Sequence, residues 1–286
     1  MTPRSQPVPE VVGWQVFDGH PVDALVTTRH GGVSAGDYGS LNLGLHVGDD
    51  AERVVENRRR AAAALGLALD DLVFCDQTHG SDVAVVGLDD RGRGTLRVDD
   101  AVPADAVVTT TPDVGLVVMV ADCVPLVLYD PGAHILAAVH AGWRGTVARI
   151  GEAAVEAMAG LGADPARIVA GIGPAVTVDR YQVGDEVADA VRASLDDDGG
   201  AGHGGSDGDE ASGGGGAVGD VVRPDGTGRW LVDLWAANRR ILVEAGLQPG
   251  NIEVSTVGTG PGTPFFSDRA ARPCGRFAAL ARLQAR

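Results

Sequence analysis

Five short runs of β-branched and other apolar residues lie between residues 82 and 141. Runs of roughly four to eight such residues, bounded by Gly, Pro or Asp, are typical of buried β-strands. Because these runs follow one another without helices between most of them, a layered α+β architecture is favoured over a regular βαβ winding. The runs begin at Asp82 (DVAVVGL), Ala104 (ADAVVTT), Gly115 (GLVVMVA), Pro125 (PLVLYD) and His134 (HILAAVH).

Helical patterns are grouped on either side of these strands. The first covers residues 51–67 and is expected to carry Arg58, Arg59 and Arg60 on its solvated side. Gly246 supplies a helix stop after the last pattern. The whole chain of 286 residues is predicted to be a single α+β domain, with mixed β-sheets flanked by helices in an αββα-like layering. The other three helical patterns cover residues 146–161, 184–195 and 233–245.

The stretch from residue 196 to residue 220 has a composition unlike the rest of the chain. It holds 11 Gly and 7 acidic residues, with no basic residue. Such a stretch cannot bury enough apolar surface to offset the entropy of ordering it, so we expect a disordered insert. His203 lies inside this insert and is expected to face solvent rather than to bind a metal.

Composition excludes several classes of function. All 23 basic residues are Arg, and the absence of Lys rules out Schiff-base, pyridoxal-phosphate and P-loop chemistry. A formal net charge of −16 argues against a protein that binds nucleic acid or an anionic membrane. The cysteines Cys75, Cys123 and Cys274 are too few and too far apart for a disulfide framework. With no apolar leader and no apolar run long enough to span a bilayer, a cytoplasmic protein is expected.

Three candidate metal ligands lie at the ends of predicted strands. They are His79 in CDQTHGSD, Cys123 in VADCVPL and His140 in AAVHAGWRG. Polar residues carried by loops on a rigid sheet are often functional. One Cys and two His can hold zinc with its fourth position open, which is the pattern of a catalytic site. Their wide separation leaves the alternative that Cys123 is a small buried hydrophobe and each His a satisfied polar residue beside a turn.

Other chemistries are open to the same residues. A metal-free Cys–His hydrolase would use Cys123 as nucleophile and His140 or His79 as base. A multicopper oxidase is not expected, because the chain has only 7 His, one of them in the insert, and no H-x-H pair. The H-x-E and P-C-x-x-C signature of zinc nucleobase deaminases is also absent.

Two segments are candidates for binding an anion. In TTRHGGVSAG, Arg29 precedes paired glycines, which allow the backbone to approach a ligand closely. In HAGWRGT, Arg144 lies beside the predicted start of a helix, where backbone amides favour phosphate or carboxylate. The alternatives are an ordinary glycine turn and a surface ion pair.

The order of several motifs resembles the laccase-domain (YfiH-like) family over about residues 26–282. This family carries the older name multicopper polyphenol oxidase and is now described as purine nucleoside phosphorylase and adenosine deaminase. The resemblance implies one catalytic domain of mixed sheets flanked by helices. It also implies a metal held by His79, Cys123 and His140, most often zinc. Copper is the alternative, because a Cys–His–His set binds copper more tightly than zinc by intrinsic affinity. The motifs are TTRHGGVS, SLNLGLHVGDD, QTHG, ADAVVTT, VADCVPL, AAVHAGWRGT, IGP and FFSDR.

The resemblance further implies the reactions and their partners. The activities of the family are phosphorolysis of adenosine, inosine and methylthioadenosine, and hydrolytic deamination of adenosine, so the expected partners are purine nucleosides and phosphate. Arg144, with Arg29 as a second candidate, would neutralise the phosphate. Asn42 and Gln77 would hydrogen-bond the base or the sugar.

The chain departs from the family pattern near its C-terminus. Ser255 stands where a Cys is common, and Cys274 where Thr often precedes Gly-Arg. In FFSDRA, Asp268 and Ala270 replace the usual Tyr and Arg. These changes spare the three candidate ligands, and we expect them to alter the rim of the substrate pocket.

Overall fold

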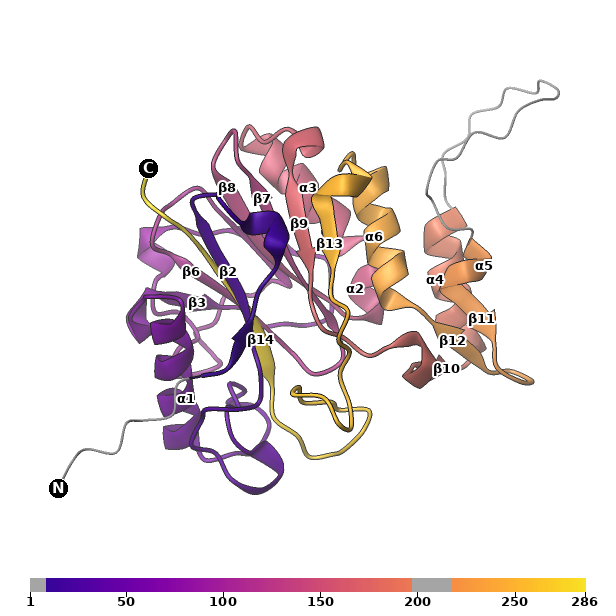
Figure 1. The fold of residues 1–286 in the computed structure, drawn as a ribbon, viewed down its shortest axis with the longest axis horizontal. Helices are drawn as coiled ribbons and strands as arrows, with labels where there is room; N and C mark the ends of the chain where they lie inside the picture. The colour runs from indigo at the N-terminus through magenta and orange to yellow at the C-terminus, as the bar shows by residue number, and fades with distance from the viewer. Residues whose placement is uncertain (1–8, 197–217) are drawn as a thin grey trace.

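The fold is known from a computed structural model that describes residues 9–196 and 218–286. Its strands form two large sheets and one small one (Figure 1). The five-stranded sheet has the order β1 (Val11–Val12), β2 (Val22–Thr27), β14 (Phe277–Leu283), β6 (Gly115–Val120) and β3 (Leu72–Phe74). The six-stranded sheet has the order β13 (Ile252–Val254), β9 (Val169–Ile172), β7 (Val124–Asp130), β8 (Ile135–Ala141), β5 (Ala106–Thr109) and β4 (Val83–Val85). The small sheet has the order β10 (Gln182–Val183), β12 (Trp230–Val232) and β11 (Val222–Pro224).

Both large sheets are mixed, as the sequence predicts. Strand β3 pairs in parallel with β6, and β4 pairs in parallel with β5. Strand β13 is parallel to β9. The central pairs, β7 with β8 and β14 with β6, are antiparallel. The α+β class is therefore confirmed.

The two large sheets pack face to face, and helices cover their outer faces. One apolar cluster lies between the sheets, a second lies between the five-stranded sheet and α1, and a third lies between the six-stranded sheet and α3 and α6. Figure 1 shows α1 on one side of the sheets and α3 and α6 on the other. This is the predicted helix–sheet–sheet–helix layering. The helices are α1 (Ala51–Ala64), α2 (Trp143–Val147), α3 (Ile150–Gly160), α4 (Asp185–Asp196), α5 (Val218–Val221) and α6 (Leu234–Glu244).

The apolar runs are continuous because the central strands are buried on both faces. In β7, Leu126 and Leu128 pack toward α3, while Val127 and Tyr129 pack between the sheets. Alternate residues of a strand point to opposite faces, so a strand between two apolar layers needs an apolar residue at almost every position. All five predicted strands form, and β4 differs in that it lies at the edge of its sheet and is not buried.

The predicted helices also form, but one of them is divided into two helices. The pattern over 146–161 becomes the end of α2 and the whole of α3, which are separated by Arg149 in a left-handed conformation with φ of 55°. Gly246 has φ of 102° just after α6, as expected for a helix stop. In the described part of the chain, no helix has the length and apolar character needed to cross a membrane.

The prediction that Arg58 lies on the solvated side of the first helix is wrong. Its side chain is buried, and the residue is only 1% exposed. Consecutive residues of a helix are about 100° apart, so three in a row cannot share one face. Arg58 lies on the same stripe as Val54 and Ala61, which faces the five-stranded sheet. Arg60 is also largely covered, since its guanidinium donates to the carbonyl oxygen of Gly31.

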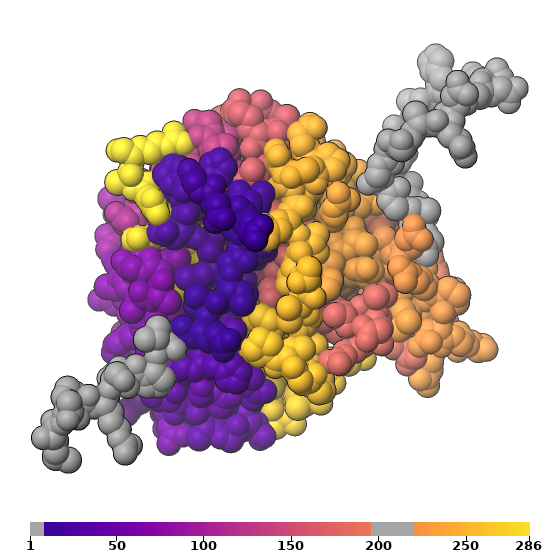
Figure 2. All heavy atoms as spheres, viewed as in Figure 1, coloured from indigo at the N-terminus to yellow at the C-terminus, as the bar shows by residue number. Residues whose placement is uncertain are grey.

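The chain between β13 and β14 crosses one face of the molecule. In Figure 2 this segment, in gold, runs between the indigo and purple side, which carries α1, and the orange side, which carries α6. It brings residues 268–272 to the cavity described below. Residues 197–217 of the predicted insert, with His203, lie outside the described residues, so the disorder of this segment stays a prediction. The prediction is wrong at the two ends of the insert, because Asp196 ends α4 and residues 218–220 belong to α5.

Candidate metal centre and active site

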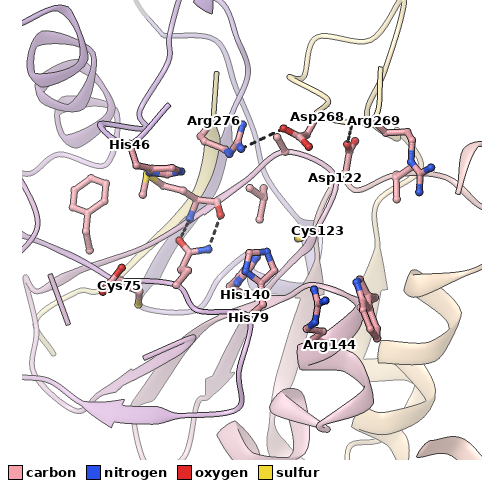
Figure 3. A pocket seen from close by; sticks show the side chains of 18 of the residues that line it. His46, Cys75, His79, Asp122, Cys123, His140, Arg144, Asp268, Arg269 and Arg276 are labelled. Carbon is pink, nitrogen blue, oxygen red and sulfur yellow. Dashed lines mark hydrogen bonds and ion pairs between the residues drawn. The ribbon is translucent and has the colours of Figure 1, made fainter. Parts of the chain in front are cut away.

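The fold brings together the three side chains proposed as metal ligands. His79 lies in the loop after β3, Cys123 lies in the turn between β6 and β7, and His140 lies near the end of β8. Their ligand atoms all lie within 4.8 Å of one another. The rings of His79 and His140 meet edge to face, with centroids 4.8 Å apart (Figure 3). The site therefore draws one ligand from a strand of the six-stranded sheet and two from connections between the large sheets, the β3–β4 loop and the β6–β7 turn.

The backbone at this site is held in uncommon conformations. His79 has φ of 63° and Asp122, next to Cys123, has φ of 91°. Non-glycine residues rarely adopt positive φ, and such strain is concentrated at functional sites. Asp122 is fixed by its carboxylate, which accepts hydrogen bonds from the Thr259 hydroxyl at 2.5 Å and the Arg269 backbone N–H at 2.6 Å. The turn that presents Cys123 is thus tied to the segment between β13 and β14.

Gly142 lets the backbone approach the ligands closely. A Cβ placed there would lie 3.0 Å from the Cys123 Sγ and 3.0 Å from the His79 Cδ2. A larger residue would press on both side chains, which would have to move by a few tenths of an ångström. The glycine in the HAGWRG motif therefore lets the ligands pack directly against the backbone.

Asp105 organises the site, although the sequence analysis did not single it out. It lies directly before β5, and its buried carboxylate accepts a hydrogen bond from the His140 Nδ1 at 2.8 Å. The same carboxylate accepts from the backbone N–H groups of Thr78, His79 and Gly80 at 3.2, 2.9 and 2.7 Å. The Thr78 hydroxyl donates as well, at 3.1 Å. Asp105 therefore positions two of the three ligands, leaving the His140 Nε2 free to face Cys123.

The electrostatics of the group favour a thiolate. Burial alone would raise the pKa of Cys123, but the His140 and His79 rings lower it to about 6. Burial would lower the pKa of His140, yet the Cys123 thiolate and the hydrogen bond to Asp105 raise it to about 9. Burial would raise the pKa of Asp105, whereas hydrogen bonds from His140 and from backbone N–H groups hold it at about 2. A thiolate is the form of Cys that binds metals and attacks electrophiles.

The three residues line a cavity of about 1010 Å³, a volume suited to a small-molecule ligand. On one side of the triangle the walls include Trp143 and Tyr181, two flat side chains beside Arg144 and Arg269. The wall on the other side includes residues of the loop before α1, of α1, of β3 and the loop after it, of β6 and of the segment before β14: His46, Arg58, Phe74, Cys75, Asp76, Gln77, Met119, Asp268 and Arg276.

Two of the four predicted substrate-binding residues line this cavity. Arg144 lies with its guanidinium 4.4 Å from the centroid of the Trp143 ring. The Gln77 amide is engaged with the backbone of Met119, donating to its carbonyl oxygen at 2.7 Å and accepting from its N–H at 2.8 Å. Gln77 thus joins the ligand loop to the end of β6. The substrate contacts of both residues stay predictions.

Arg29 and Asn42 are not among the residues that line the cavity. Arg29 donates to the Gly39 carbonyl oxygen at 2.9 Å and stacks over Phe266. The buried Asn42 amide bonds to Gly44 and Asp49 and accepts from the Arg276 backbone N–H at 2.8 Å. The Asn42 amide is thus engaged at both its nitrogen and its oxygen, while Arg29 is held through Nε and its stacking on Phe266. The roles of both residues in substrate binding stay predictions.

The comparisons with known proteins agree with this architecture. A family profile described as "Multi-copper polyphenol oxidoreductase laccase" matches residues 23–284. The chain belongs to the laccase-domain family. The purine nucleoside phosphorylase of Deinococcus radiodurans is 42% identical over 229 residues, which cover 80% of this chain and 76% of that protein. Adenosine deaminase RL5, from an unknown prokaryotic organism, is 41% identical over 254 residues, which cover 87% of this chain and 88% of that protein.

Solved structures of the family have the same fold. The crystal structure of YlmD from Geobacillus stearothermophilus superposes with a TM-score of 0.84 at 34% sequence identity, covering 98% of this chain and 100% of that chain. The crystal structure of Bacillus licheniformis YfiH gives a TM-score of 0.82 at 34% identity, covering 92% of this chain and 93% of that chain. Similarity therefore extends over both large sheets and the turns that carry the candidate ligands.

Proposed function

We propose that this protein is a zinc-dependent enzyme that acts on purine nucleosides. The proposed reactions are phosphorolysis of adenosine, inosine and methylthioadenosine, and hydrolytic deamination of adenosine. The convergence of His79, Cys123 and His140 at the wall of a large cavity is the observation that carries the proposal. The names of two relatives at about 40% identity supply the substrate class.

The residues present suit a zinc ion. One Cys sulfur and two His nitrogens form a donor set of catalytic zinc sites, which keep a fourth position open. The carboxylate of Asp105 on the His140 Nδ1 is the kind of outer partner that orients a metal-binding imidazole. When bound, zinc would supply Lewis-acid activation of a water molecule near neutral pH. Copper is the alternative metal, because it binds such ligands more tightly by intrinsic affinity.

The residues of the chain itself would bind and orient the nucleoside. Trp143 and Tyr181 offer flat surfaces on which a purine can stack. Arg144 lies over the Trp143 ring and brings a positive charge to the same wall. Asp105 keeps the His140 Nε2 directed at the site, and the strained turn at Asp122 holds Cys123 in place.

Two measurements on one preparation test the proposal. Metal analysis of purified protein is expected to give about one zinc per chain. Adenosine turnover is expected to yield inosine without phosphate, and adenine with ribose 1-phosphate when phosphate is added. Zinc-loaded protein that turns over no purine nucleoside would leave only a binding role and would refute the proposed function.

A second candidate is a metal-free Cys–His hydrolase of the deamidase or peptidase type. The array of Asp105, His140 and Cys123 favours it, because a carboxylate orients a His beside a Cys whose pKa is lowered to about 6. The two candidates differ in their sensitivity to chelation and alkylation, which is developed below. A multicopper oxidase is not supported, since the described residues hold this single group of three metal-binding side chains.

A further inference from the structure

Arg58 is a buried cation that forms no ion pair among the described residues; the charge of Asp100 acts on it from beyond ion-pair distance. It lies in α1, is 1% exposed and lines the cavity. Within residues 9–196 and 218–286, no carboxylate lies within ion-pair distance of its guanidinium. A buried charge without a partner costs several kcal/mol, so proteins rarely keep one without a reason.

The partners of Arg58 satisfy one side of its guanidinium. The Nε donates to the Leu43 carbonyl oxygen at 2.8 Å, and Nη1 donates to the carbonyl oxygens of Gly94 and Thr95 at 2.5 and 3.0 Å. The face of the guanidinium lies 4.0 Å from the centroid of the Phe74 ring. The Nη2 group meets the Met119 sulfur, a weak acceptor, at 3.7 Å. Within the part of the chain that the structure describes, its two N–H donors therefore lack an oxygen partner at the cavity wall.

Two further basic residues line the same part of the cavity. His46, Arg58 and Arg276 are all among the residues that line the cavity. Burial lowers the pKa of His46, and the charges of Arg276 and Arg58 lower it further while Asp76 raises it, so His46 is a neutral hydrogen-bonding group near pH 7. Figure 3 shows His46 and Arg276 on the same side of the cavity. The Arg276 Nη2 lies 3.4 Å from Asp268, longer than a strong charged hydrogen bond, while Asp268 contacts Arg272 at 2.5 Å. Arg276 is thus only loosely neutralised.

We propose that Arg58, Arg276 and His46 form an oxyanion subsite of the cavity that binds inorganic phosphate, the co-substrate of phosphorolysis. The inference rests on the proposed function for the identity of the anion. Two arginines line this wall together with the carboxylates of Asp76 and Asp268. What favours an anion here is the buried charge of Arg58, which no carboxylate of the described residues neutralises at ion-pair distance. Nη2 of Arg58 and Nη2 of Arg276 are the donors left to an anion, because Nε and Nη1 of Arg58 and Nη1 of Arg276 already donate to backbone carbonyl oxygens. Donors from two guanidinium groups can bind separate oxygens of one phosphate.

The chain keeps this subsite within reach of the candidate metal ligands. Met119, whose sulfur contacts Arg58, is four residues before Cys123, so their Cα atoms are at most about 14 Å apart. Phe74, which stacks on Arg58, is five residues before His79, so that separation is at most about 18 Å. A nucleoside between the metal centre and the subsite would therefore meet phosphate inside one cavity.

The test is a calorimetric titration of zinc-loaded protein with inorganic phosphate at constant ionic strength. Wild type is expected to bind one equivalent. Arg58→Met and Arg276→Met are each expected to raise the Kd at least about tenfold, since hydrogen bonds to charged groups are lost. Arg276 is partly exposed, so its variant keeps the test valid if Arg58→Met fails to fold. Asp268→Asn is expected to lower the Kd, because it removes the competing carboxylate.

A matched control comes from the same helix. Arg60→Met removes the same charge from α1, but Arg60 does not line the cavity, and its guanidinium contacts Glu56 and Gly31. It is expected to leave the Kd for phosphate within about twofold of wild type. Unchanged binding in both Arg58→Met and Arg276→Met, or no binding by wild type, would overturn the subsite.

Three further variants and ligands test phosphate binding at other places in the cavity. If phosphate binds the metal instead, the zinc-free Cys123→Ala variant loses binding while Arg276→Met keeps it, and the proposal fails. If Arg144→Met alone loses phosphate binding, the phosphate binds at the wall that carries Trp143, and the proposed subsite is refuted. Adenosine 5′-monophosphate tests whether the anion belongs to a nucleotide: binding of this compound without binding of inorganic phosphate would refute the assignment to free phosphate.

Nucleoside turnover, measured in parallel, keeps this inference distinguishable from the proposed function. Phosphate binding that depends on Arg58 and Arg276, without any turnover, would reject the function and keep the subsite. Turnover with phosphate affinity unaltered in both variants would reject the subsite alone.

Discussion

Asp105 and Arg58 are both buried charges beside one cavity, and the chain surrounds them in different ways. Asp105 accepts hydrogen bonds from a hydroxyl, an imidazole and three backbone N–H groups, so its charge is compensated by the fold. Arg58 has three carbonyl acceptors, an aromatic ring and a thioether, but no carboxylate among the described residues.

The contrast distinguishes a group that positions other protein atoms from one that can still accept a ligand. A carboxylate with all its lone pairs engaged has little capacity left for substrate, and its contribution is to fix the ligands around it. A guanidinium with free donors at a cavity wall keeps that capacity. The metal end of the cavity is thus preorganised, whereas the arginine end is completed by an anion.

Removing a ligand at the preorganised end is expected to have the largest effect. Cys123→Ala should abolish stoichiometric zinc and reduce nucleoside turnover to background, while far-UV circular dichroism shows that the fold is retained. Cys75→Ala is the matched control, since this buried thiol lines the same cavity outside the ligand triangle and has a pKa raised by burial to about 12. Full zinc content in purified Cys123→Ala, measured by mass spectrometry, would contradict the assignment of the ligands.

Chelation and alkylation are expected to separate the zinc enzyme from the metal-free hydrolase. A chelator should inactivate the zinc enzyme, and added zinc should restore it. Iodoacetamide should modify Cys123 rapidly at pH 7 only after chelation, because a thiol with a pKa of about 6 is then mostly thiolate and zinc otherwise shields it. Activity that survives the chelator and is lost to iodoacetamide would establish the hydrolase instead.

Weakening the carboxylate that orients His140 is expected to have an intermediate effect. Asp105→Asn should lower zinc affinity by about 10–100-fold, the usual range for an outer partner of a metal ligand. Competition with a chromophoric chelator measures this change. Asp76→Asn serves as control, because it removes a carboxylate from the cavity wall that, within the described residues, makes no hydrogen bond to a candidate ligand. Equal zinc affinity in the two variants would show that Asp105 does not act through His140.

The smallest effect is expected from the acidic insert. Replacing residues 196–220 with a short Gly-Ser linker should leave the catalytic efficiency and its salt dependence unchanged within error. The charges of the insert act over only about 8 Å at physiological salt. Helices α4 and α5, which hold the first and the last residues of this segment, contribute none of the described residues that line the cavity. A large change in the KM for phosphate, in either direction, would show that the insert reaches the site.

The sequence predicts the strands and the layering well, because a strand that is buried on both faces needs an apolar residue at almost every position. The runs at 115–120 and 125–130 are apolar throughout for that reason, and both form central strands. The ends of strands are visible in the same way, so His79, Cys123 and His140 could be proposed as a group. Their actual convergence depends on strand order, which periodicity does not report.

The roles of Asp105 and Arg58 were not predicted from the sequence. Asp105 precedes a recognised strand in ADAVVTT, but its role depends on β5 pairing with β8 so that it lies beside His140. The backbone contact between them, from the His140 N–H to the Asp105 carbonyl oxygen at 2.8 Å, exists only in the folded sheet. Arg58 could have been found from its place on the buried stripe of the first helix, at the helical spacing of Val54 and Ala61. The expectation that charged residues face solvent outweighed that signal, and the buried cation was missed.

The three candidate ligands come from different elements, which affects how easily the two large sheets can separate locally. His79 follows a strand of the five-stranded sheet, His140 belongs to the six-stranded sheet, and Cys123 lies in the turn that joins them. An ion held by all three would join the two layers at one edge, so local separation of the sheets there would require coordination bonds to break. Amide hydrogens near residues 76–82 and 121–124 would then exchange with solvent slowly in the loaded protein and quickly after chelation. Those at the centre of β7 and β8, which exchange only when the whole core unfolds, would respond far less.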